Sequence, residues 1–153
     1  MAPAGDDRSA IVRFLGGDGL DAAGRSFADV VAMDDHAIER HHDFIQWLFP
    51  LDEPSQAVPS SPVLTPADIA LLRASAMAQR RLGEASARML RFYRMTARWR
   101  QSFDHNHLRI TRIIKSLRLL AGDAAAEAFK AAILDEASGT AISVTALRFW
   151  EEA

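Results

Sequence analysis

The chain has 153 residues, 49% hydrophobic and 25% charged, which is typical of one globular domain with its own core. It contains no cysteine, which excludes disulfides, thiolate metal sites and thiol nucleophiles. The net charge is −2, and no apolar run approaches the roughly 18–20 residues that span a bilayer, so we expect a soluble, cytoplasmic protein without a secretory signal.

The N-terminal third of the chain predicts three helices, over residues 9–15, 26–33 and 34–49. The second begins at a capping-box sequence, because Ser26 is followed three residues later by Asp29. The third helix has a one-sided stripe at helical spacing, formed by Ile38, His41, Ile45 and Leu48. We therefore expect one unbroken helix from residue 34 to the proline that follows residue 49.

Proline dominates residues 50–66, which hold five of the six prolines and are predicted to form an extended loop. Thr65, Pro66 and Asp68 then have the pattern of a helix N-terminus. Further helices are predicted over residues 65–74, 75–94, 104–121, 123–137 and 143–150. The sequence shows no alternating strand pattern and no internal repeat. The predicted fold class is therefore all-α, a compact single-domain bundle of about six or seven helices.

Charge is distributed unevenly along the chain. Residues 1–72 carry a net charge of −8, residues 73–118 carry +10, and residues 119–153 carry −4. The arginine-rich centre could bind nucleic acid, another phosphate or an acidic peptide. Its arginines could instead neutralise the acidic N-terminal third within the fold, and the sequence leaves both interpretations open.

Two acid-x-x-His spacings, Glu39 to His42 and Asp104 to His107, raise the question of a metal site. This spacing places both side chains on one helix face, as in di-iron bundles, but such a site needs two further inward-facing glutamates. No other glutamate falls on an apolar face, so we expect neither metal nor cofactor. We assign no catalytic residue, and helix capping and core hydrogen bonding account for these side chains.

Two residues depart from the pattern of their helices. Asn106 falls on the apolar side of its helix, where an amide most often bonds orphan backbone donors or a neighbouring loop, a ligand contact being the alternative. Trp47 points away from the apolar stripe of its helix. We expect it either to pack under the proline-rich loop or to form an exposed contact.

Two segments resemble the conserved domain of the opioid growth factor receptor family. Residues 42–51, HDFIQWLFPL, resemble the block H-x-[YF]-I-Q-W-L-F-P, and residues 106–117, NHLRITRIIKSL, resemble N-x-L-R-I-T-R-I-x-K-S-L. Residues 64–69 and 89–93 are similar to weaker landmarks, whereas Arg94 stands where the family has glycine. The arginine-rich composition is typical of a GC-rich bacterial coding sequence, which indicates a short bacterial member.

The resemblance covers residues 25–122. Residues 1–24 are then an N-terminal extension with a short helix, and residues 123–153 form helices packed on the same domain. The resemblance implies a non-enzymatic, receptor-like module that binds a peptide or another anionic ligand. Alternatives are a helical enzyme or metal protein using histidines and carboxylates, and a nucleic-acid- or phosphate-binding domain. Peripheral membrane association is implied by the resemblance alone.

The resemblance also carries over one set of positions on the two motif helices, and these are the candidate ligand-binding residues. They are His42, Gln46, Trp47, Asn106, Arg109, Thr111 and Arg112. We expect the helices over residues 35–49 and 105–121 to pack together, so that these groups meet across a shared groove. They would then form either an open ligand site or a buried polar lock.

Overall fold

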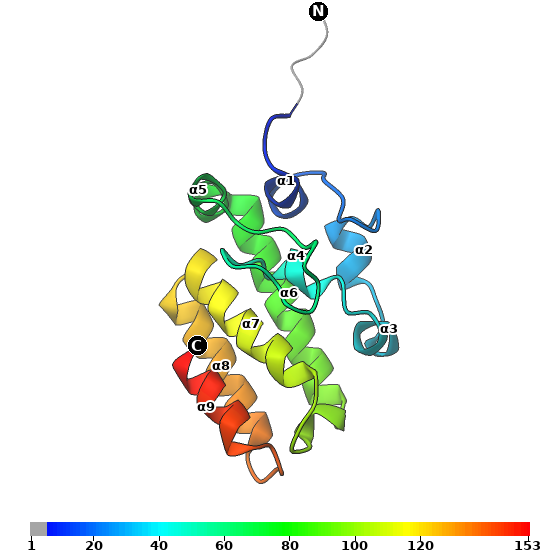
Figure 1. Cartoon of the computed structure of the whole chain (residues 1–153), viewed down its shortest axis with the longest axis vertical. Coiled ribbons are helices and arrows are strands. Elements are labelled where there is room, and N and C mark those ends of the chain that lie inside the picture. The colour runs from blue at the N-terminus through cyan, green and yellow to red at the C-terminus, as the bar shows by residue number, and fades with distance from the viewer. Residues whose placement is uncertain (1–5) are drawn as a thin grey trace, which may run out of the picture.

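The computed structural model describes residues 6–153, and its helices surround a long central helix (Figure 1). The elements are α1 (Ala10–Gly16), α2 (Phe27–Val31), α3 (Asp35–Arg40), α4 (Ile45–Leu48), α5 (Pro66–Ala74), α6 (Ala76–Met95), the 3-10 helix η1 (Arg98–Arg100), α7 (Asn106–Leu120), α8 (Asp123–Ala137) and α9 (Val144–Glu152). Across this range strand pairing is limited to one bridge, between Leu51 and Val63. The all-α prediction is confirmed for the described residues, although short helices raise the count to nine, six of them of seven residues or more.

The central helix is α6, which contacts α1, α2, α5, α7 and α8. Its buried apolar side chains follow helical spacing, as predicted for one apolar face: Ala78, Leu82, Ala85, Met89, Phe92 and Tyr93. Helices α7 and α8 form the most extensive helix pair, joined at Gly122, whose positive φ of 105° favours glycine. None of the helices over residues 6–153 has the length and hydropathy of a membrane-spanning segment.

Capping residues fix the helix starts as the sequence predicts. Ser26 with Asp29, and Thr65 with Asp68, form complete capping boxes. The second box also ties two helices together, because the Ser9 hydroxyl at the start of α1 donates to Asp68 Oδ1 at 2.8 Å. The predicted N-terminal extension is described from residue 6 onward, since residues 1–5 lie outside the described range. Within it, Phe14 and Leu15 of α1 are fully buried in the core.

The prediction of one unbroken helix over residues 34–49 is wrong. Helix α3 ends at Arg40, His41 has an extended backbone, and α4 begins at Ile45. Glu39 and His42 therefore do not share one helix face. The break has a tertiary cause, because the Arg109 guanidinium of α7 donates to the main-chain oxygens of Ile38 and His41. In a continuous helix those two oxygens would accept from residues 42 and 45 instead.

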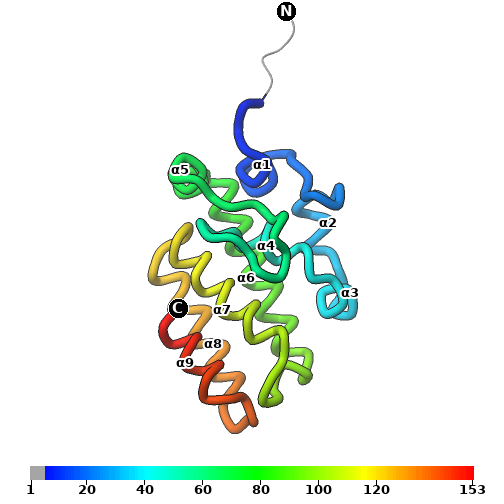
Figure 2. Tube along the Cα trace, in the orientation of Figure 1, coloured from blue at the N-terminus to red at the C-terminus, as the bar shows by residue number. Residues whose placement is uncertain are grey.

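The chain between α4 and α5 forms a long loop beside α7 (Figure 2). Side chains of α7 hold its first residues by their main-chain oxygens. Arg112 Nε donates to the oxygen of Phe49 at 2.9 Å, and the buried Ser116 hydroxyl donates to that of Pro50 at 2.8 Å. Helix α7 thus bonds both the α3–α4 break, just before the first motif block, and the end of that block at the start of the loop.

Candidate functional site

Arg109 is the residue around which the two motif blocks assemble. Its side chain is buried, with Nη1 2.9 Å from the oxygen of Ile38 and the guanidinium 5.3 Å above the ring of Phe44. Burial lowers the pKa of Arg109. These contacts place Arg109 in the structural junction between α3, α4 and α7, and part of its side chain also borders a cavity.

Asn106 lies behind Arg109 and is fully buried, in keeping with its place on the apolar side of its helix. Its amide nitrogen donates to Glu39 Oε2 at 3.0 Å and to Asp104 Oδ1 at 2.8 Å. Its oxygen accepts longer bonds of 3.4 Å from the Tyr93 hydroxyl and from Arg109 Nη1. Burial raises the pKa of Tyr93, so this hydroxyl stays a neutral donor. Asn106 therefore joins α3, α6 and the start of α7 through side chains. Of the partners expected for it, orphan backbone donors or a neighbouring loop, it bonds the turn before α7 through Asp104.

A cavity of about 330 Å³ lies between α4, the loop over residues 51–57 and the exposed side of α7. Five candidate residues line it: His42, Gln46, Arg109, Thr111 and Arg112. The other two do not. Asn106 is buried behind Arg109, and Trp47 is buried with its ring packed edge-to-face on Phe14 of α1, 5.5 Å between centroids. The helix break explains the position of Trp47, because α4 starts in a new direction after residue 44.

The polar groups of this cavity are incompletely bonded. Arg112 donates from Nε to Phe49, but its buried Nη2 has no hydrogen-bond partner among the described residues. Burial lowers the pKa of Arg112 to about 10. Gln46 Nε2 donates to the His42 oxygen at 3.1 Å, whereas its buried Oε1 has no partner over the same range. At the rim, Lys115 lies 3.6 Å from Glu53. Two residues that line the cavity thus keep an unbonded buried group, a cationic donor on Arg112 and an acceptor on Gln46.

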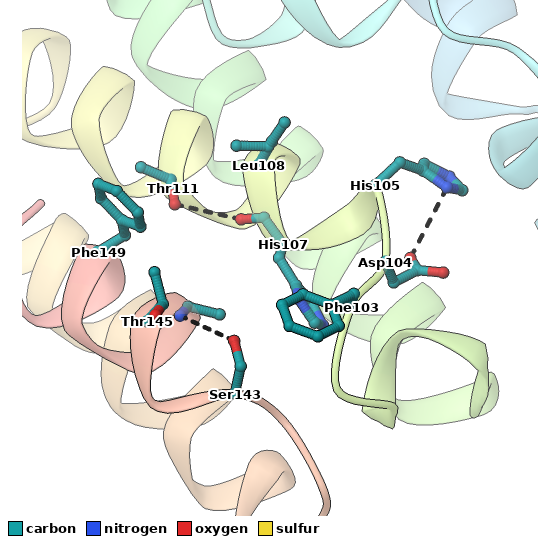
Figure 3. A pocket seen from close by; sticks show the side chains of 10 residues that line it. Phe103, Asp104, His105, His107, Leu108, Thr111, Ser143, Thr145 and Phe149 are labelled. Carbon is teal, nitrogen blue, oxygen red and sulfur yellow. Dashed lines mark hydrogen bonds and ion pairs between the residues drawn. The ribbon is translucent and has the colours of Figure 1, made fainter.

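A second, apolar hollow of about 480 Å³ lies between the start of α7 and α9 (Figure 3). Phe103, Leu108 and Phe149 line it with largely exposed side chains. His107 also lines it, but its Nε2 is already bonded to the Trp99 oxygen at 2.7 Å. Sequence reasoning missed this hollow because its exposed apolar side chains come from separate elements, Phe103 from the turn before α7, Leu108 from α7 and Phe149 from α9.

A cluster of titratable groups lies between α3 and the start of α7. His105 Nε2 is 3.3 Å from Glu39 Oε1, and His105 Nδ1 is 3.8 Å from Asp104 Oδ1. Burial and the nearby Arg109 charge lower the pKa of His105, so the imidazole is neutral at pH 7. The ring of His42 stacks edge-to-face on that of His105 with centroids 4.9 Å apart. In Figure 3 the ring of His105 points away from Phe149, although His105 is among the residues that line the apolar hollow.

Most of the twelve basic side chains of residues 73–118 form ion pairs or hydrogen bonds within the domain. Six form ion pairs, namely Arg88, Arg94, Arg98, Arg100, Lys115 and Arg118. Three of these side chains pair with acids of residues 1–72, and the other three pair with acids of residues 119–153. Four more donate to main-chain oxygens, namely Arg73, Arg81, Arg109 and Arg112. Much of this positive charge therefore serves contacts within the domain. Arg88 and Arg112 each keep buried nitrogens without a hydrogen-bond partner among the described residues, and of the two only Arg112 lines the 330 Å³ cavity.

Comparison with known proteins gives a direct family assignment. The family described as "Opioid growth factor receptor (OGFr) conserved region" matches residues 23–137, three-quarters of the chain. The chain belongs to this family. The human opioid growth factor receptor is 36% identical over 118 residues (63% of this chain and 16% of the receptor), and the mouse receptor is 36% identical over 98 residues (52% and 15%). No solved structure matches the chain.

The opioid growth factor receptor family region includes every residue of the 330 Å³ cavity and of the Glu39–Asp104–His105 cluster. The apolar hollow is different, because α9 supplies part of its wall from beyond residue 137. The chain spans about one-sixth of the length of the curated receptors that it matches. The family match thus applies to one region of those longer proteins.

Proposed function

We propose that this domain is a non-enzymatic, receptor-like binding module that takes up a peptide through one of its carboxylates. The binding site is the 330 Å³ cavity between α4, the loop over residues 51–57 and α7. The observation that carries this proposal is the buried Nη2 of Arg112, which has no hydrogen-bond partner in residues 6–153. The curated relatives are described as receptors for a growth factor, which agrees with a binding role.

The electrostatics of Arg112 favour an anionic occupant. A buried charged donor without a partner costs free energy, because water no longer solvates it. No acidic side chain within the described residues forms an ion pair with Arg112, and its only hydrogen bond goes to the main-chain oxygen of Phe49. A carboxylate placed at Nη2 would form a charge-assisted bond, worth roughly 1.5–3 kcal/mol.

The walls of the cavity favour a peptide over a bare anion. Apolar groups face it from both sides, including Ile45, Leu51, Pro54 and Leu108. The volume of about 330 Å³ falls near the lower end of ligand pockets, roughly 300–1,000 Å³. A peptide with an apolar side chain next to a carboxylate would pack that side chain against these walls and neutralise Arg112 with the carboxylate. The unbonded Gln46 Oε1 is placed to accept a peptide N–H.

The test begins with a selection of peptides that bind the purified chain, from a random library with free C-termini. The dissociation constant of each recovered peptide is then measured by fluorescence anisotropy for wild type, Arg112→Gln and the exposed control Arg91→Gln. We expect about a 10–100-fold loss for Arg112→Gln, the equivalent of one charged hydrogen bond. Arg91→Gln should bind like wild type.

Peptide chemistry provides the matching half of this experiment. Each carboxylate of a recovered peptide is replaced in turn by an amide, and one replacement should weaken binding to wild type but not to Arg112→Gln. If no peptide is recovered, or if wild type and Arg112→Gln bind all recovered peptides equally, the proposal is wrong. Circular dichroism of both variants confirms that the comparison is made between folded proteins.

A further inference from the structure

Three metal-ligating side chains converge at the junction of α3 and α7, beside the proposed peptide cavity, which His105 also lines. Glu39, Asp104 and His105 each offer one ligand atom, and these atoms lie within 4.8 Å of one another. Glu39 comes from α3, and the other two residues from the turn that starts α7. The helix break after residue 40 and the packing of α3 on α7 bring together residues more than sixty positions apart.

Three potential ligand atoms of this cluster form no hydrogen bond to the described residues. Glu39 Oε1 and His105 Nε2 are both buried, lack a hydrogen-bond partner among the described residues, and face one another at 3.3 Å. The Asp104 side chain is 4% exposed, and its Oδ2 accepts no hydrogen bond from residues 6–153. Two ligands of a tetrahedral zinc ion, each about 2.0–2.2 Å from the metal, are about 3.3 Å apart. The observed separation of Glu39 Oε1 and His105 Nε2 equals that spacing.

We propose that Glu39, Asp104 and His105 bind one divalent first-row transition-metal ion, with Zn²⁺ as the reference ion. Two carboxylates balance the charge of the ion, and a set of imidazole and carboxylate ligands suits zinc and its neighbours better than Mg²⁺ or Ca²⁺. This inference departs from the sequence-based expectation of no metal, which considered the two acid-x-x-His pairs separately. It does not depend on the proposed peptide site, because metal alone is the ligand tested.

Asn106 holds two of the proposed metal ligands in place by hydrogen bonds, as residues around metal ligands usually do. Its buried amide nitrogen donates to Glu39 Oε2 and to Asp104 Oδ1, the oxygens that do not carry the proposed metal bonds. One fully buried group thereby orients both carboxylates at once. Hydrogen bonds of this kind fix ligand orientation in metal sites generally.

Two neighbours complete the site. The exposed His42 ring lies against His105 and can supply a fourth ligand, or leave that position to water. Arg98 approaches both carboxylates at 3.7 and 3.8 Å, but it forms no hydrogen bond to them and its side chain is 66% exposed. Arg98 therefore acts as a weakly held cation that a metal ion displaces.

The experiment is a titration of untagged, chelator-stripped protein with Zn²⁺ in competition with a chromophoric chelator. Wild type should bind one equivalent, with Mg²⁺ failing to compete. Glu39→Gln and His105→Gln should each weaken binding at least about tenfold, and Arg98→Gln should tighten it by removing the competing cation. The matched controls His36→Gln and Glu84→Gln change exposed residues of the same types and should leave the affinity unchanged.

The gain for Arg98→Gln separates a metal site from a general loss of folding, since a damaged protein does not bind more tightly. Melting of each variant without Zn²⁺ reports its fold independently. The proposal is overturned if wild type binds no stoichiometric Zn²⁺. It is overturned equally if the Glu39 and His105 variants bind as wild type does, because the ion would then be elsewhere on the protein.

Discussion

Arg109 Nη1 on α7 donates a 2.9 Å hydrogen bond to the main-chain oxygen of Ile38 on α3. The same guanidinium bonds the oxygen of His41, so one side chain satisfies two acceptors at the end of a helix. These acceptors lie just before the first motif block, which begins at residue 42, and the donor lies in the second block. The contact that holds α3 to the second block is therefore first of all a backbone lock, and the cavity borders it.

Replacement of Arg109 by Met should lower the free energy of unfolding by about 2–5 kcal/mol, because two buried carbonyls lose a charged donor. Arg109→Lys should recover part of this loss, since an ammonium cannot reproduce the planar geometry of the guanidinium. Urea denaturation with an unchanged m-value is the measurement. The exposed Arg91→Met should stay within about 0.5 kcal/mol of wild type. A loss below about 1 kcal/mol for Arg109→Met would contradict the lock.

The helix break shows what sequence periodicity is able to predict. The spacing of Ile38, Ile45 and Leu48 is compatible with one helix, and all three side chains are buried as that pattern implies. Periodicity reports which side chains face the core, but the break depends on a donor at residue 109. No local pattern encodes a hydrogen bond between residues that far apart in the sequence, so the two helices were predicted as one.

Of the candidate site, too, only the part that depends on local sequence patterns can be predicted. The buried position of Asn106 follows from its place on an apolar helix face, and the capping boxes at Ser26 and Thr65 follow from local spacing. The cavity residues were named by resemblance, and the structure brings five of the seven around one cavity. The cluster of Glu39 with His105 was not predicted, because it requires knowledge of which helix ends meet.

Asp68 should make stability depend on acid pH. Partial burial acts to raise the pKa of Asp68, but the Thr65 N–H and the Ser9 hydroxyl donate to its carboxylate and hold the pKa below its ordinary value. Because the pKa of Asp68 is lower in the folded than in the unfolded protein, its carboxylate stabilises the fold at pH values above the ordinary pKa of an aspartate. This stabilisation is lost as the pH falls through the folded-state pKa.

Wild type should therefore lose more stability than Asp68→Asn when the pH is lowered from about 6 to about 3. Thermal melts across this range provide the comparison. Asp135→Asn, which alters an exposed carboxylate, should keep the wild-type slope. If the melting temperatures of wild type and Asp68→Asn fall in parallel with pH, Asp68 does not contribute to the loss of stability in acid.

Gly83 and Gly19 should respond in opposite directions to alanine. Gly83 lies inside α6 with open space around a new Cβ, so Gly83→Ala should stabilise the protein by about 0.5–1 kcal/mol through helix propensity. At Gly19 a Cβ would lie 2.7 Å from the backbone carbon of Arg13, so Gly19→Ala should destabilise by about 1–3 kcal/mol. Denaturant titration of both variants tests the pair, and a gain for Gly19→Ala would show that the turn after α1 relaxes freely.

Arg88 is the best comparison for Arg109, because both are buried arginines that hold α3 in place. Arg109 bonds Ile38 of α3, and Arg88 bonds Asp35 of α3 and Met33 just before it. Arg88 Nη2 donates to the Met33 oxygen and to Asp35, but its Nε and Nη1 are buried without partners within residues 6–153. Arg109 has no such unbonded buried nitrogen. Removal of a side chain that carries unsatisfied donors also removes their desolvation cost, which offsets the bonds lost.

Arg88→Met should accordingly cost only about 0–1.5 kcal/mol, clearly less than Arg109→Met, although both changes remove one buried charge. Asp35 can return to water after the change because its side chain is 39% exposed. The two variants are compared by urea denaturation in one buffer, and Arg88→Met should also show a weaker salt dependence than wild type, since its ion pair is gone. Equal losses for the two variants would mean that burial of the charge, and not the number of bonds it makes, determines the contribution of each arginine.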